Sequence, residues 1–120
     1  MEKREAEAFL RRLKGYEEAS AIMENRYLYA VWQGEETSGL KAEYLDMRRR
    51  LAAVRKEIFI SLNSIENGDS RRVLWQLYIE RKGKEETAEY LHMTVGDVER
   101  LRCKGLYLMK RPRAKWIIIE

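Results

Sequence analysis

The chain runs for 111 residues before its only proline, Pro112. Proline interrupts helices, and all-β folds need frequent turns rich in glycine and proline. Glycine is also scarce, with 7 residues in 120. This run therefore predicts long helices and an all-α fold, and it argues against a β-sandwich or barrel.

Residues 3–32 show the period of one long helix. Its inward positions step alternately by four and three residues, which is a heptad seam with one polar member. They are Phe9, Leu13, Tyr16, Ser20, Met23, Tyr27 and Ala30. The polar stretch 33–39, which contains two glycines, predicts a loop after this helix.

A second heptad seam follows, and we expect its helix to end at Asn67-Gly68. The seam positions are Leu40, Tyr44, Met47, Leu51, Val54, Ile58, Ser61 and Ile65. A short loop between two long helices favours antiparallel packing, so residues 1–68 are expected to form an antiparallel helical hairpin.

Both helices of this hairpin carry further apolar residues off their seams. These are Leu10, Ile22, Leu28, Val31, Trp32, Leu45, Phe59, Ile60 and Leu62. Two helices cannot cover all of them. Either the C-terminal domain packs on them or a second subunit does, in a homodimer formed through the hairpin.

From residue 69 the pattern changes to shorter helices. Asp69 or Ser70 is expected to cap a helix that Lys82-Gly83 ends. A short helix over residues 84–91 follows. His92-Met93 then predicts a tight turn before the last helix.

Thr94 opens that next helix, with Asp97 three residues later in a variant of the capping box. A short helix, a tight turn and a second helix with outward basic side chains are typical of a helix-turn-helix. Residues 69–111 are therefore predicted to form a three-helix domain with this motif. Cys103 on its last helix is expected to be a small packing residue.

Several segments of this domain carry a family resemblance. They are Arg72-Val73-Leu74, Gln76-Leu77-Tyr78, Lys84-Glu85-Glu86-Thr87-Ala88-Glu89-Tyr90-Leu91-His92-Met93-Thr94, Val98-Glu99-Arg100-Leu101 and Lys104-Gly105-Leu106. This series resembles region four of bacterial sigma factors. With the hairpin before it, the chain is similar to small phage transcriptional regulators of the RinA/ArpU type. The resemblance implies a phage or prophage protein that binds double-stranded promoter or late-operon DNA in the bacterial cytoplasm.

The sequence departs from the sigma-factor pattern at three places. His92 stands where the turn usually has glycine, and that position favours positive φ. Val95 and Gly96 replace the Arg-Glu pair with which primary sigma factors read the promoter. Asp97 and Glu99 would repel phosphates unless they cap the helix or accept a hydrogen bond from cytosine.

Positive charge gathers near the C-terminus of a chain whose net charge is +4. This distribution is expected of a surface that faces phosphates. Candidate groove contacts are Thr94, Arg100 and Lys104. Candidate phosphate contacts are Lys84, Arg102, Lys110, Arg111, Arg113 and Lys115. Residues 112–120 form a basic and apolar tail, and Trp116–Ile119 is expected to fold back over the hairpin or to pair with another chain.

The sequence offers no catalytic set. It has one histidine and one cysteine, no glycine-rich phosphate loop and no metal-ligand spacing, so we expect a protein that is not an enzyme and that has no cofactor or metal. It shows neither a secretory signal nor an apolar stretch of membrane-spanning length, so we expect a cytoplasmic protein without a membrane partner.

Two alternatives keep the fold and change the function. One is a small terminase-like subunit for DNA packaging, which would assemble into a ring. The other is an interaction module that docks on RNA polymerase without reading bases, which the residues from Val95 to Glu99 favour.

Overall fold

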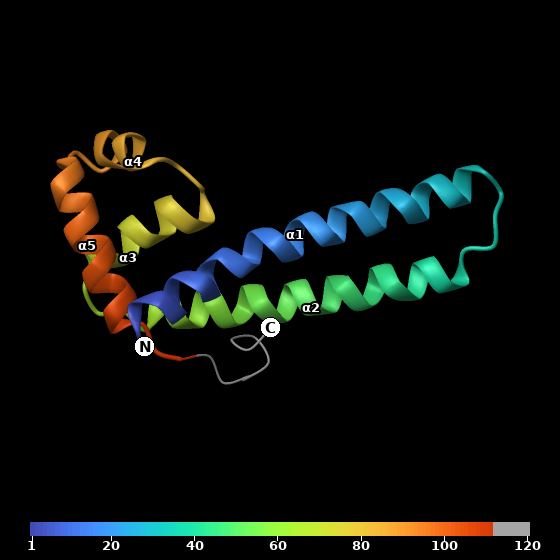
Figure 1. The fold of residues 1–120 in the computed structure, drawn as a ribbon, viewed down its shortest axis with the longest axis horizontal. Coiled ribbons are helices and arrows are strands. Elements are labelled where there is room, and N and C mark those ends of the chain that lie inside the picture. The colour runs from blue at the N-terminus through green and yellow to red at the C-terminus, as the bar shows by residue number, and fades with distance from the viewer. Residues whose placement is uncertain (112–120) are drawn as a thin grey trace. The chain divides into compact units, whose positions relative to one another are not determined.

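The computed structural model describes residues 1–111, and within them every regular element is helical. The long helices are α1 (Lys3–Trp32) and α2 (Ser38–Asn63). They are followed by α3 (Gly68–Leu74), the π-helical turn η1 (Trp75–Ile79), α4 (Lys84–Tyr90) and α5 (Val95–Leu108). The predicted all-α class is confirmed, and α1 has the predicted bounds (Figure 1).

The contacts divide the chain into two compact units. The hairpin unit is Arg11–Lys56, and the terminal unit joins Met1–Leu10 to the described chain from Glu57 to Arg111. Each long helix therefore contributes one part to each unit. The predicted domain boundary after residue 68 stays a prediction.

In the hairpin unit, α1 and α2 run alongside each other in opposite directions (Figure 1). The rings of Tyr27 and Tyr44 stack with centroids 6.0 Å apart, and Arg55 Nη2 lies 3.5 Å from Glu17 Oε1. Every position of the two predicted seams is buried or half-buried. The heptad period thus identified the faces that the two helices cover.

The terminal unit has the larger core. Phe9 and Leu10 from α1, Ile58 and Leu62 from α2, and Leu74 from α3 are each at most 1% exposed. The core of this unit also contains buried residues of α5 and of the segment after it, which are Val98, Leu101, Gly105, Leu106 and Met109. Hydrophobic burial on this scale is what holds short helices such as α3 and α4 in place.

Within this unit, the N-terminus contacts the end of the described chain through a hydrogen bond and an ion pair. The amino group of Met1 donates to the carbonyl of Met109 at 2.9 Å, and Arg111 Nη2 lies 2.8 Å from Glu5 Oε2. The first turns of α1 are therefore part of the scaffold that carries α5.

Two predicted helix boundaries are wrong, the end of α2 and the cap of α3. Asn67-Gly68 does not end the second helix, because α2 ends at Asn63 and the hydroxyl of Ser64 donates to the carbonyl of Ser61 at 2.6 Å. Asn67 instead caps α3, since its side chain accepts the backbone N–H of Ser70 at 2.9 Å. Asp69 and Ser70, predicted as caps, lie inside the first turn of α3.

No helix among the described residues combines the length and the apolar character needed to cross a membrane.

Candidate nucleic-acid interface

A tight turn joins α4 to α5. Gly83 precedes α4 with extended backbone, and after Leu91 the chain reverses at His92, whose φ is 56°. The N–H of Met93 donates back to the carbonyl of Ala88 at 2.9 Å. A left-handed φ is uncommon for a residue with a Cβ, although histidine adopts it more readily than most. The predicted turn at His92-Met93 is confirmed.

A capping box starts α5. The N–H of Asp97 donates to Thr94 Oγ1 at 3.1 Å, and the N–H of Thr94 donates to Asp97 Oδ2 at 3.3 Å. Hydrogen bonds from the side chain and then the backbone of Thr94 hold the pKa of Asp97 below its ordinary value. Asp97 thus remains ionised and engaged at the helix start, as the capping-box prediction required.

An apolar cluster sets how α4 and α5 pack. Its buried members are Val73, Ala88, Val98 and Leu101, and Leu77, Leu91 and Met93 pack against it. Ala88 is the small residue through which α4 approaches its neighbours. This cluster joins α3, α4 and α5, so the inner faces of α4 and α5 are packed against it. The outward faces of the two helices do not contribute to this packing.

A second close approach brings α3 against α5. A Cβ on Gly105 would lie 2.8 Å from Leu74 Cδ1 and 3.2 Å from Ser70 Cβ. Real Cβ atoms do not come so near a neighbour, so only glycine allows this packing.

Arg102 lies at the centre of an internal polar network. Its Nη1 is 2.7 Å from Glu7 Oε2 and 3.2 Å from the hydroxyl of Tyr78, and its Nη2 is 2.7 Å from Glu99 Oε1. Its side chain is only 14% exposed. The hydrogen bonds to Glu99 and then to Tyr78 raise the pKa of Arg102 above its ordinary value. The guanidinium therefore joins α1, η1 and α5 within the terminal unit.

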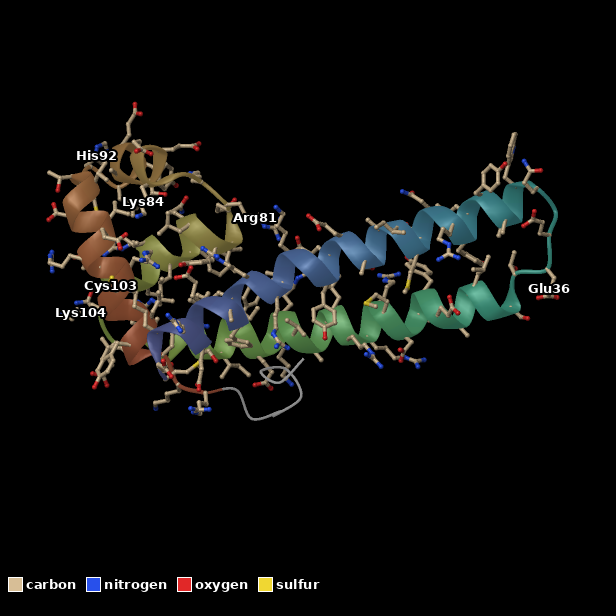
Figure 2. The ribbon with its side chains drawn as sticks, in the orientation of Figure 1. Glu36, Arg81, Lys84, His92, Cys103 and Lys104 are labelled. Atoms are coloured by element: carbon tan, nitrogen blue, oxygen red, sulfur yellow. The ribbon has the colours of Figure 1, made fainter. Side chains whose placement is uncertain are left out.

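Lys84 belongs to the same network. Its Nζ lies 2.8 Å from Glu99 Oε2, which ties the start of α4 to the middle of α5, and Figure 2 shows Lys84 between these helices. Hydrogen bonds from Arg102 and then Lys84 lower the pKa of Glu99 to about 2. Glu99 is thereby neutralised by two cations, which removes the phosphate repulsion expected of it from sequence.

The outward face of α5 presents Gly96, Arg100, Lys104 and Tyr107, which are all exposed. Their spacing of four, four and three residues places them along one stripe of the helix. Arg100 has only a loose contact, 3.8 Å from its Nη2 to Asp97 Oδ1. Lys104 has no ion-pair or hydrogen-bond partner among residues 1–111, and Figure 2 shows it projecting from α5.

The remaining predicted contacts lie at or beyond the end of α5. The side chain of Lys110 is exposed, while its backbone N–H donates to Ser64 Oγ at 3.3 Å. Arg111 is paired with Glu5, as described above. Arg113 and Lys115, together with the Trp116–Ile119 prediction, lie outside the described residues.

Tyr107 is an exposed residue of α5 that is not among the contacts predicted from the sequence. It is 72% exposed and lies seven residues, or two helical turns, after Arg100. An aromatic side chain in a basic stripe suits contact with sugar or base edges. The helical spacing from Arg100 was the signal in the sequence that could have identified it.

This arrangement can bind an anion through Arg100 and Lys104, while Lys84 and Arg102 are occupied inside the unit. Over the described residues no three histidine, cysteine, aspartate or glutamate side chains are grouped to hold a metal. Cys103 is half-buried, with its thiol 3.6 Å from Glu99 Oε1. Comparison with protein-family models, with curated proteins and with solved structures finds no match to this chain.

Proposed function

We propose that the protein is a DNA-binding transcriptional regulator of phage or prophage type, in which α4 and α5 act as a helix-turn-helix of the sigma region-four kind. The single observation that carries this proposal is the capped, rigidly supported start of α5 with Arg100 and Lys104 exposed on one stripe. A recognition helix needs a free outer face, a fixed entry angle and cations that can reach the duplex.

The proposed DNA surface differs from the set suggested by charge alone. Arg100, Lys104 and Tyr107 of α5 would enter or border the major groove, and Lys110 would follow the backbone. Arg102 is not part of the proposed DNA surface, because its guanidinium nitrogens already donate to Glu7, Glu99 and Tyr78. Lys84 is left out because it is bonded to Glu99.

Thr94 and Gly96 place the backbone of α5 near the duplex in this proposal. The hydroxyl of Thr94 accepts the N–H of Asp97, so its role is to hold the helix start and not to read a base. A Cβ on Gly96 would meet only Thr94 Oγ1, at 3.7 Å. Gly96 is therefore open toward solvent, which allows a phosphate or sugar to come close.

Fluorescence anisotropy with labelled duplexes from phage regulatory regions tests this proposal across a range of salt concentrations. The double variant Arg100→Ala, Lys104→Ala should bind roughly tenfold or more weakly. The slope of log K against log salt should shrink by about 2 if both side chains contact phosphates.

A matched control removes two exposed cations elsewhere, Arg26→Ala and Lys41→Ala in the hairpin unit, which leaves the same net charge as the test variant. It should bind almost as the unmodified protein does. Equal losses in the two double variants would mean that the binding is a nonspecific charge effect. An unmodified protein that binds no duplex at low salt would contradict the proposal.

One observation favours a second candidate, an interaction module that docks on RNA polymerase. Lys84, Arg102 and Arg111 are each paired with a carboxylate, so fewer cations face outward than the sequence suggests. Val95, at 41% exposed, adds apolar surface beside the start of α5. Retention of full activity by the Arg100→Ala, Lys104→Ala variant in a transcription assay would favour this candidate.

A further inference from the structure

We propose that the outer face of α1 in the hairpin unit binds a second copy of this chain, with Asn25 close to the two-fold axis. The face consists of Ile22, Asn25, Leu28, Tyr29 and Trp32 and is called the outer stripe below. The proposed dimer does not depend on DNA binding, since none of the stripe residues belongs to the proposed DNA surface.

The outer stripe is a second heptad seam on the same helix. Ile22, Asn25, Tyr29 and Trp32 step by three, four and three residues, with Leu28 beside them. The first seam, through Met23, Tyr27 and Ala30, already faces α2. At 100° per residue the two seams lie on nearly opposite sides of α1, so no part of the hairpin can cover the outer stripe.

The apolar side chains of this stripe are widely exposed. Trp32 is 78% exposed, Tyr29 61%, Ile22 59% and Leu28 53%. Tyr29 and Trp32 alone leave roughly 300 Å² open, and the four together leave about 500 Å². Each partner in a standard interface contributes about 800 Å², so the stripe supplies most of what one side of a stable dimer needs.

The hairpin unit also lacks a second layer. Within Arg11–Lys56 the buried side chains are Leu13, Ser20, Ala30 and Val54, a thin core for two helices. Pairing two copies through the outer stripe would cover α1 on both sides, by α2 of its own chain and by α1 of the second copy.

Asn25 favours a second copy of this chain as the partner that covers the outer stripe. It is the one polar residue in the stripe, and its amide both donates and accepts hydrogen bonds, so two Asn25 side chains can satisfy each other across a two-fold axis. A single asparagine in an apolar seam fixes the register of coiled-coil dimers in this way. The stripe contains no charged residue, so two copies meet there without like-charge repulsion. Glu18, one heptad step before Ile22, is already paired with Lys14 at 3.9 Å.

Sedimentation equilibrium of the full chain tests the dimer. The unmodified protein should have about twice the chain mass of 14.4 kDa at micromolar concentration. Ile22→Glu with Trp32→Glu should raise the dimer dissociation constant at least a hundredfold while circular dichroism stays unchanged, because both side chains are exposed. Ile60→Glu, at a comparably exposed isoleucine of the terminal unit (47%), should leave the mass at that of a dimer.

Cross-linking tests the position of the axis. In a Cys103→Ser background, Asn25→Cys should form an intermolecular disulfide under mild oxidation, whereas Ile60→Cys should not. A monomeric unmodified protein, a dimer that survives the double glutamate substitution, or equal cross-linking at both positions would overturn the proposal.

Discussion

Arg102 Nη1 lies 2.7 Å from Glu7 Oε2, although 95 residues separate the two in the chain. This pair fastens the beginning of α1 to the middle of α5 inside the terminal unit. Both side chains are largely buried, at 14% and 24% exposed, so the loss of either would leave the other with one opposite charge fewer in a poorly solvated place. The pair therefore belongs to the scaffold that presents the outer face of α5.

Replacing Arg102 should destabilise the fold. Arg102→Ala leaves Glu7 and Glu99 without their shared cation, so we expect the free energy of unfolding to fall by about 2–3 kcal/mol. Urea denaturation followed by circular dichroism measures this change. Lys14→Ala is the control, because the Lys14–Glu18 pair is exposed and 3.9 Å long, and its loss should cost less than about 0.5 kcal/mol. An Arg102→Ala variant as stable as the control would contradict the scaffold role.

The ion pairs of Glu99 should make stability depend on pH in the acid range. The pKa of Glu99 is lowered from 4.5 to about 2 in the folded protein, so it contributes stability above pH 4.5 that is lost as the pH falls toward 2. Glu99→Gln should therefore be clearly less stable than the unmodified protein at pH 7, and this difference should shrink near pH 2.5. Paired urea titrations at both values measure it. A difference that stays constant would show that Glu99 is not held ionised by Lys84 and Arg102.

Gly105 and Gly15 should respond in opposite directions to the same substitution. Gly105→Ala drives a methyl group into Leu74 and Ser70 and should cost about 1–3 kcal/mol. Gly15, inside α1, has no atom within 4 Å of a new Cβ, so Gly15→Ala should stabilise by about 0.5–1 kcal/mol. Thermal unfolding of the two variants side by side measures both. Similar shifts would mean that α3 and α5 are not packed as closely as described.

The turn at His92 should prefer glycine. With φ at 56°, His92 holds a left-handed conformation that glycine adopts without a Cβ penalty, so His92→Gly should stabilise by about 0.5–1 kcal/mol. His92→Val should destabilise by at least as much, because a β-branched residue is strained there. Thermal unfolding of both variants measures these changes in stability. A glycine variant less stable than the unmodified protein would contradict the turn geometry.

Local patterns were enough to predict much of this protein. Scarce glycine and proline predicted helices, and the heptad steps identified both covered faces of α1 and α2. The Thr94–Asp97 box and the His92 turn depend on contacts within a few residues, which is why spacing alone revealed them. The predicted end of α2 was wrong because Asn67-Gly68 suits either the end or the start of a helix. The hydrogen bond from the N–H of Ser70 to the side chain of Asn67 identifies it as a helix start.

The tertiary structure decided which cations remain free. Lys84, Arg100, Arg102 and Lys104 look alike as charges in the sequence, and all four were predicted to contact DNA. Folding brings Glu7 to Arg102 from 95 residues away and sets Glu99 between Arg102 and Lys84, while Arg100 and Lys104 stay exposed on the outward face of α5. Sequence spacing carries the period of a helix, but the partner of a charge depends on which distant segment packs beside it.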